Sequence, residues 1–141
     1  MLQCHVPQIA ELEKLCFNDP WSENSIASEL DNRLSCWLVA IADDKVVGYV
    51  GSQTVLGETD MMNIAIHPDY RKQGIATELI SALIEALNER SSHSLMLEVR
   101  ASNEPAKSLY LKMGFDVVGV RKNYYRNPRE DALILRKEWN L

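Results

Sequence analysis

The fold is decided by the stretch Asn63-Ile64-Ala65-Ile66-His67-Pro68-Asp69-Tyr70-Arg71-Lys72-Gln73-Gly74-Ile75-Ala76. Its apolar start, Ile64-Ala65-Ile66, predicts a strand that stops at His67-Pro68. The basic loop Arg71-Lys72-Gln73 follows, and Gly74-Ile75-Ala76 opens a helix. The first N–H groups of a helix have no partner within it and carry the positive end of its dipole. The junction therefore suits an anion such as a pyrophosphate.

Gly74 strengthens this hypothesis, because a residue without Cβ lets a ligand approach the backbone closely. Arg71 and Lys72 add positive charge nearby. The two common phosphate loops, Gly-x-Gly-x-x-Gly and the Gly-Lys-Ser/Thr loop, are absent from the sequence. A helix start with glycine for packing and basic residues in water explains the same pattern. The residues alone leave both interpretations open.

Outward from this stretch, hydrophobic spacing predicts the other elements. Ile9, Leu12 and Cys16 recur at helical spacing, and Ser22 caps a second short helix after Pro20. The predicted strands are Trp37–Ala42, Val46–Val55, Asp60–Ile66, Leu95–Val99, Val117–Arg121 and Ala132–Arg136. The predicted later helices are Ile75–Arg90 and a segment with Ala106, Leu109, Tyr110 and Met113, which Gly114 closes.

This order of elements predicts an α/β fold with a mixed sheet. Paired strands come first and strand–helix–strand units follow, so helices are expected on both faces of the sheet. The 141 residues, 46% of them apolar, suit one domain that spans residues 1–141. No repeat or linker divides the chain.

Composition excludes several classes of protein. The net charge of −5 argues against a nucleic-acid-binding protein, whose binding face is usually basic. The three cysteines have no metal-type spacing and no neighbouring histidine pair, so we expect no metal site and reduced thiols. The sequence shows no signal peptide and no apolar run long enough for a membrane span, so we expect a cytoplasmic protein without a membrane partner.

Two residues outside the loop could perform chemistry. Glu98 lies within the apolar strand Leu95–Val99, where a carboxylate must be paired, protonated or beside a cleft. It is either a general base or a surface carboxylate, for example one paired with Arg100. Tyr110 lies on the apolar helix face and is either a core residue or a proton donor. Spacing does not separate these alternatives.

The segment Arg71-Lys72-Gln73-Gly74-Ile75-Ala76 resembles the Arg/Gln-x-x-Gly-x-Gly/Ala motif of the GNAT N-acetyltransferases. That resemblance implies that these residues bind the pyrophosphate of acetyl-CoA. It also implies that the strand Ile64-Ala65-Ile66 offers its backbone to the pantetheine arm. The GNAT fold is then expected, with a central mixed sheet flanked by about four helices.

The run Leu97-Glu98-Val99-Arg100-Ala101-Ser102-Asn103 resembles the bacterial ribosomal-protein-alanine branch of that superfamily, as do Pro20-Trp21-Ser22-Glu23 and Asn123-Tyr124-Tyr125. The resemblance extends from about Phe17 to Leu135. It implies that Glu98 accepts a proton, that Tyr110 donates one and that Asn103 contacts acetyl-CoA. It also implies a peptide entrance at Tyr124 and Tyr125, to which we add Trp21.

The implied reaction is direct transfer of an acetyl group from acetyl-CoA to the N-terminal peptide of a small-subunit ribosomal protein. An α-amine has a pKa of ~8 and lysine ~10.4, a difference of roughly 3 kcal/mol in deprotonation, so one glutamate manages the former more easily. Another amine as acceptor, or a non-catalytic acyl-CoA-binding module, are the alternatives. The chain begins almost directly with its first helix, so the family's first strand is expected to be short or missing.

Overall fold

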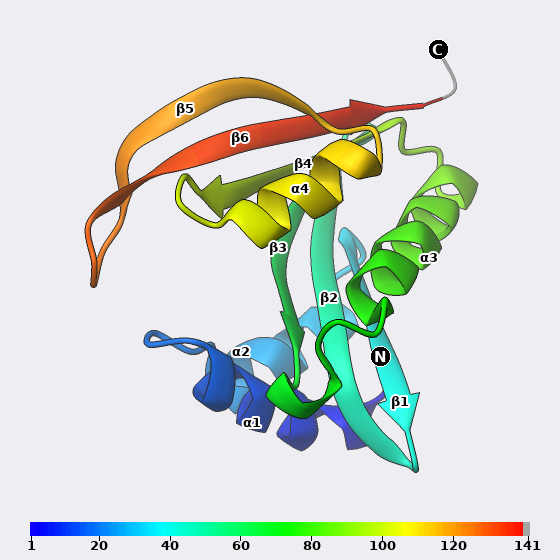
Figure 1. Cartoon of the computed structure of the whole chain (residues 1–141). Coiled ribbons are helices and arrows are strands. Elements are labelled where there is room, and N and C mark those ends of the chain that lie inside the picture. Colours follow the sequence, from blue (N-terminus) through cyan, green and yellow to red (C-terminus); the bar gives the residue numbers. More distant parts are fainter. Residues whose placement is uncertain (140–141) are drawn as a thin grey trace.

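The computed structural model describes residues 1–139 and contains four α-helices and six strands within them (Figure 1). The helices are α1 (Val6–Cys16), α2 (Glu23–Ser28), α3 (Ile75–Glu89) and α4 (Glu104–Lys112). The strands are β1 (Ser35–Ala42), β2 (Lys45–Val55), β3 (Glu58–Ile66), β4 (Ser94–Arg100), β5 (Asp116–Tyr125) and β6 (Glu130–Glu138). Short 3-10 turns cover Gln3–His5, Glu29–Asp31 and Pro68–Tyr70.

The strands form one mixed sheet in the order β1-β2-β3-β4-β6-β5. All neighbours are antiparallel except β3 and β4, which are parallel because the long helix α3 carries the chain back between them. The predicted mixed α/β fold is therefore confirmed. Within residues 1–139, the sheet starts at β1, after α1 and α2, as the short or missing first strand implied.

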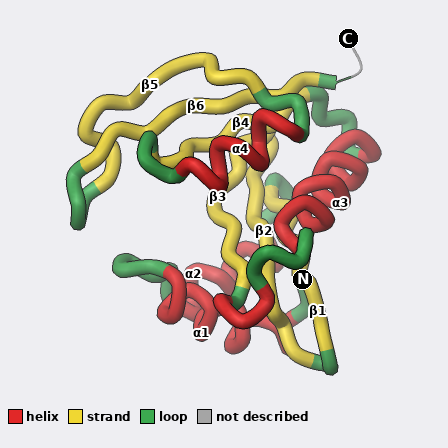
Figure 2. Tube along the Cα trace, viewed as in Figure 1, coloured by secondary structure: helices red, strands yellow, loops and turns green. Residues whose placement is uncertain are grey.

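Helices cover both faces of the sheet (Figure 2). Adjacent residues of β2 show why, since Tyr49 packs in the core cluster under α1 and Val50 packs in the cluster under α3. Successive side chains of a strand point to opposite faces, so one strand supplies both cores. The α1 cluster includes Ile9 and Leu12, and the α3 cluster includes Leu83 and Leu87.

Most predicted boundaries agree with the structure to within two residues. The main difference is β5, which continues four residues beyond the predicted Arg121 and ends at Tyr125. Its register with β6 shifts between Arg121 and Tyr125, so the strand is irregular where polar residues follow one another. This extension brings Tyr124 and Tyr125 to the tip of the β5–β6 hairpin, beside the cleft described below.

Candidate active site

The site is created where β3 and β4 separate. The two strands pair only at Glu58–Asp60 with Ser94–Met96 and then diverge. At the same point, β3 has a bulge opposite Gly51 and Ser52, with Met62 as the extra residue. A bulge bends its strand and increases the local twist, so it turns β3 away from β4. Beyond this point the two strands no longer pair with each other.

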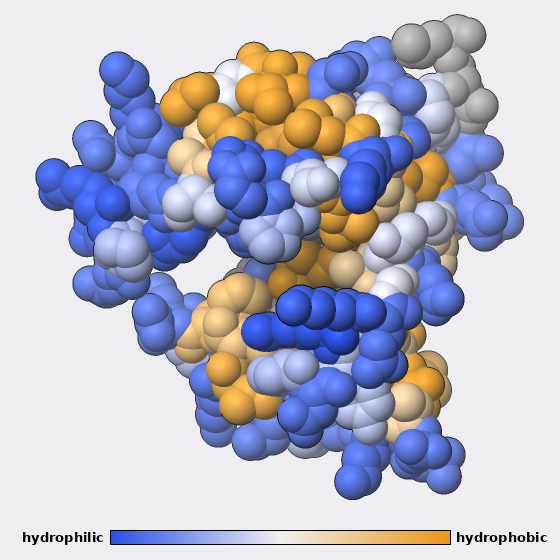
Figure 3. Space-filling model, in the orientation of Figure 1, coloured by the Kyte–Doolittle hydropathy of each residue, from blue (hydrophilic) through white to orange (hydrophobic). Residues whose placement is uncertain are grey.

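A cleft of about 940 Å³ occupies this separation. It is lined by residues 16–19 and Trp21 before α2, residues 61–64 of β3, residues 97–100 of β4, Asn103, Ala106 and Tyr110 at α4, and residues 124–127 of the β5–β6 hairpin. Figure 3 shows the hollow between the upper and lower parts of the molecule, with apolar surface at its bottom. The cleft brings together Glu98, Tyr110, Asn103, Ile64 and the predicted entrance residues Trp21, Tyr124 and Tyr125.

Glu98 and Tyr110 reach this cleft from opposite faces of the sheet. Leu97 and Val99 are buried in the same cluster as Tyr110, so Glu98 between them points to the other face. In a continuous sheet the two side chains would be separated by backbone. Because β3 has left β4, a window connects the two faces, and both residues line it.

Glu98 is partly exposed and surrounded by polar groups. Its Oε1 lies 3.2 Å from Nε of Arg121. The Tyr124 hydroxyl hydrogen-bonds with the carboxylate, and this bond, followed by burial, raises the pKa of Tyr124. Burial, then the charge of Glu98, also raises the pKa of Asp60. The alternative pairing of Glu98 with Arg100 is wrong, because Arg100 binds Glu130 instead, at 3.3 Å.

Tyr110 is 5% exposed, and its ring packs edge-on against Phe115. Its hydroxyl lies 4.0 Å from Sδ of Met61 across the separation, which is a weak contact for a phenol. Burial raises the pKa of Tyr110 to about 12. The phenol therefore stays protonated at ordinary pH and faces the cleft without a strong acceptor among residues 1–139.

The loop before α3 ends at a glycine in the left-handed conformation. Gly74, the N-cap of α3, has φ of +81°, and a Cβ there would meet nothing within 4 Å. Gly74 supplies no side-chain cap, so it does not satisfy the first backbone N–H groups of the helix. The exposed Lys72 and Gln73 lie beside it. These donors fit a diphosphate.

Three other predicted residues have specific positions. Nε of Arg71 donates to the carbonyl of Ile66 at 3.1 Å, so this guanidinium folds back on the end of β3. Ala65 is buried under α1. The amide oxygen of Asn103 caps α4 by accepting from the N–H of Ala106 at 3.2 Å, so its amide nitrogen is the group available to a ligand.

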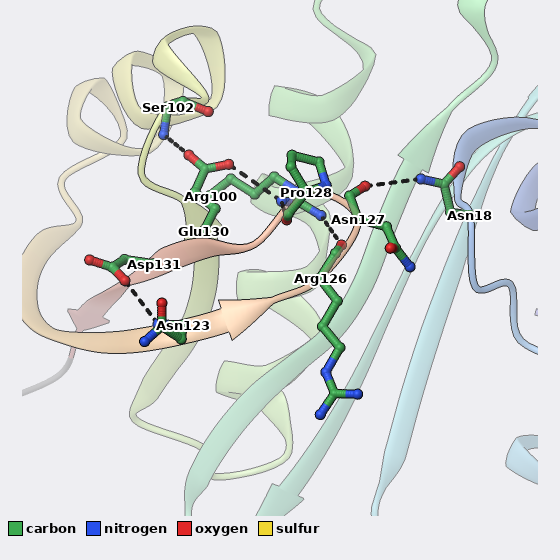
Figure 4. Close-up of polar contacts among 9 residues, drawn as sticks. All are labelled: Asn18, Arg100, Ser102, Asn123, Arg126, Asn127, Pro128, Glu130 and Asp131. Atoms are coloured by element: carbon green, nitrogen blue, oxygen red, sulfur yellow. Dashed lines mark hydrogen bonds and ion pairs between the residues drawn. The ribbon is translucent and has the colours of Figure 1, made fainter.

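A network around Arg100, which sequence analysis missed, fixes the hairpin tip over the cleft (Figure 4). Its guanidinium donates to the carbonyls of Pro128 and Arg126, at 3.0 and 3.1 Å. Its Cζ lies over the Tyr125 ring, 4.4 Å from the ring centroid. Glu130 also accepts hydrogen bonds from the side chain and the backbone N–H of Ser102, and these bonds lower the pKa of Glu130.

The hairpin tip also meets the opposite wall. Nδ2 of Asn18, in the α1–α2 loop, donates to the carbonyl of Asn127 at 3.4 Å (Figure 4). This contact closes an arch over one end of the cleft, between two segments 109 residues apart in sequence. An arch of this kind admits the end of a chain more readily than a chain that continues in both directions.

The chain is similar to proteins of known family. The model of the acetyltransferase (GNAT) family matches residues 6–115. The chain belongs to the GNAT acetyltransferase family. GNAT enzymes use acetyl-CoA.

Individual GNAT relatives are similar over nearly the whole chain. The [ribosomal protein bS18]-alanine N-acetyltransferase of Escherichia coli K12 is 37% identical over 132 residues, 92% of this chain and 88% of that one. The protein of the same name from Haemophilus influenzae is 37% identical over 135 residues, 94% and 91% of the two chains. The crystal structure of the Escherichia coli ribosomal-protein-S18-alanine N-acetyltransferase superposes with a TM-score of 0.91 at 34% identity, covering 100% and 92%.

Two further features concern the described residues as a whole. Residues 1–139 contain no group of three or more histidine, cysteine, aspartate or glutamate side chains arranged to hold a metal ion. No helix within the same range is long and apolar enough to cross a membrane.

Proposed function

We propose that this GNAT enzyme transfers the acetyl group of acetyl-CoA to the α-amine of the N-terminal alanine of a small-subunit ribosomal protein. The main support is the meeting of Glu98 and Tyr110, from opposite faces of the sheet, in the cleft between β3 and β4. The names of the relatives support the choice of acceptor. The arch at Asn18 and Asn127 supports a chain terminus rather than an internal lysine.

The donor occupies the side of the cleft next to α3. The N–H groups that follow Gly74 hold the diphosphate, with Arg71, Lys72 and Gln73 adjacent. The pantetheine arm lies along the edge of Ile64, Ala65 and Ile66 that β4 leaves uncovered, in place of the missing neighbour strand. In the structure without donor, the Arg71 side chain bonds to the Ile66 carbonyl on this strand. Ile75, Ala76 and the amide nitrogen of Asn103 complete the contacts on this side.

The acceptor enters under the hairpin, between Trp21 and the pair Tyr124 and Tyr125. Glu98 takes a proton from its ammonium group. The neutral nitrogen then attacks the thioester carbonyl and forms the C–N bond, while a backbone N–H near Ile66 stabilises the charge on oxygen. As the C–S bond breaks, Tyr110 gives its proton to the departing thiolate and the new amide nitrogen loses its second proton to solvent. Glu98 then releases its proton to solvent, and Tyr110 recovers one from solvent.

The proposed acceptor is tested with acetyl-CoA and a panel of peptides that begin with Ala, Ser, Met or acetyl-Ala, followed by mass spectrometry. The alanine peptide should gain one acetyl group at its α-nitrogen, and the acetyl-Ala peptide should gain none even when it contains lysine. Acetylation of internal lysine at the same rate as the alanine terminus would contradict the proposal.

The three free cysteines and the ribosomal acceptor also support a cytoplasmic location.

The donor site is tested by Gly74→Ala, with Gly57→Ala as its matched control. Both glycines have φ near +80°, so alanine at either position should lower stability by about 1–2 kcal/mol. The loss should be larger at Gly57, where the new Cβ would lie 3.1 Å from the His93 ring. Only at Gly74 would the new Cβ point where the diphosphate lies. Gly74→Ala should raise the KM for acetyl-CoA by about tenfold and leave the peptide KM unchanged. Equal donor KM values in the two variants would contradict this site.

A further inference from the structure

Glu13 is a charged residue in an apolar environment that the mechanism above does not use. It lies in α1, is 1% exposed, and shares the buried face of the helix with Ile9 and Leu12. A buried carboxylate is costly unless it is paired or fully hydrogen-bonded. Within residues 1–139, no lysine, arginine or histidine forms an ion pair with it, so hydrogen bonds must compensate its burial.

Three donors from three different elements meet this carboxylate. The backbone N–H of Trp21, before α2, donates to Oε1 at 2.9 Å. Nδ2 of Asn63, in β3, donates to Oε2 at 2.9 Å, and the hydroxyl of Tyr49, in β2, donates to the same oxygen. Burial raises the pKa of Glu13, while the bonds from Tyr49 and Trp21 act against that rise.

Two of the three donors line the cleft, and the third does not. Trp21 and Asn63 are on the cleft wall, whereas Tyr49 is fully buried behind it. A role limited to joining helix and sheet would not require partners at the wall. Apolar side chains of similar size often stabilise such a contact as well as a buried charge does.

Glu13 also determines which way the Asn63 amide faces. Because Nδ2 of Asn63 donates to Glu13, its Oδ1 faces the other way and accepts from the N–H of Ile64 at 3.1 Å. Asn63 directly follows the bulge residue Met62, so this pair of bonds fixes the backbone where β3 leaves β4. On the other side, the bond to the Trp21 N–H holds the loop, and the Trp21 ring packs 5.4 Å from that of Trp37.

We propose that Glu13 is a positioning residue for the acceptor, acting through Trp21 and Asn63 to hold the peptide-binding wall of the cleft. This inference rests on the proposed function, because it concerns the acceptor of the same reaction. Glu13 contacts neither the α3 start nor the loop Arg71-Lys72-Gln73 in the described structure. It reaches Ile64, on the pantetheine side, only through Asn63, so its loss should affect the acceptor more than the donor.

The test compares Glu13→Gln with Tyr49→Phe. Glutamine at this position keeps the shape but turns one acceptor oxygen into a donor NH2 group, which faces the N–H of Trp21 or the amide of Asn63. The peptide KM of Glu13→Gln should rise by about tenfold or more, the effect of losing a hydrogen bond to a charged group, with the acetyl-CoA KM within about twofold of wild type. Tyr49→Phe removes only the donor behind the wall and should leave both KM values unchanged.

The inference would be overturned if the peptide KM of Glu13→Gln were unchanged, or if the peptide KM rose equally in Glu13→Gln and Tyr49→Phe. It would also be overturned if the acetyl-CoA KM of Glu13→Gln rose as much as its peptide KM. If Glu13→Gln does not fold, Asn63→Ala must show the same separation of the two KM values, and an unchanged peptide KM in Asn63→Ala overturns the inference.

Amide exchange at Trp21 gives a readout that does not need activity. Exchange should accelerate by about tenfold in Glu13→Gln and not in Tyr49→Phe. Wild-type enzyme that is inactive toward the alanine-starting peptide would contradict the proposed acceptor. Unchanged exchange of the Trp21 amide in Glu13→Gln would contradict the role of Glu13.

Discussion

Replacing Glu98 with glutamine should lower kcat/KM for an alanine-starting peptide by about 10²- to 10⁴-fold, the range typical of a lost general base. Glutamine has nearly the same shape as glutamate, and its amide can still contact the Tyr124 hydroxyl, so the cleft should persist. It cannot accept a proton from the acceptor ammonium. Initial rates with saturating acetyl-CoA, together with calorimetric affinity for coenzyme A, measure the effect, and only the rates should change.

Glu58→Gln is the matched control for this prediction. Glu58 also lies in the sheet and also pairs with an arginine, Arg136, at 3.2 Å, but it does not line the cleft. Loss of such an exposed ion pair is worth about 0–1 kcal/mol in stability, and Glu58→Gln should keep wild-type turnover. A Glu98→Gln enzyme as active as Glu58→Gln at every pH would remove Glu98 from the mechanism.

Replacing Tyr110 with phenylalanine should lower kcat by about 10²-fold or more, because the thiolate then leaves without a positioned acid. The fold should be kept, since the ring still packs on Phe115 and the hydroxyl only touches Sδ of Met61 at 4.0 Å. Release of free thiol in the presence of the peptide measures the step. Tyr49→Phe, which removes a buried hydroxyl outside the cleft, is the control and should release thiol at the wild-type rate.

The pKa of Tyr110 determines the pH range over which the activity loss of Tyr110→Phe should be constant. The pKa of Tyr110 is raised from the ordinary value of 10.0 to about 12 by burial, so the folded protein favours the protonated phenol. Its stability contribution is complete below pH 10.0 and is lost as the pH rises through about 12. The deficit of Tyr110→Phe should therefore be the same at every assay pH below 10.0. A deficit that disappears within this range would contradict the role of Tyr110 as the acid.

Local sequence patterns were sufficient to predict much of this fold. The apolar spacing of α3, with Leu79, Ile80, Leu83 and Leu87 buried, and the turn at Asp43 and Asp44, where both residues have positive φ, depend on neighbours in sequence. The loop before α3 is predictable for the same reason. Its Gly74 adopts the left-handed conformation that only glycine takes without strain.

The features that sequence analysis missed depend on contacts between distant segments. The buried position of Glu13 is not predictable from the sequence, because a carboxylate on a helix is usually exposed. Its three hydrogen-bond partners lie 8 to 50 residues away in the sequence. The bulge at Met62 depends on the register with β2, which period-two alternation does not contain. In the sequence, Arg100 is an ordinary residue at the end of a strand. Its role in holding the hairpin tip depends on partners 26 to 30 residues later, which only the fold brings close to it.

We infer, as the central claim, that the separation of β3 from β4 holds the acetyl donor between Glu98 and Tyr110. A crystal structure of the protein with coenzyme A tests it most directly. We expect the diphosphate on the N–H groups that follow Gly74, the pantetheine arm along Ile64–Ile66, and the sulfur within hydrogen-bond distance of the Tyr110 hydroxyl. Coenzyme A bound elsewhere, or with its sulfur remote from Tyr110, would contradict the claim.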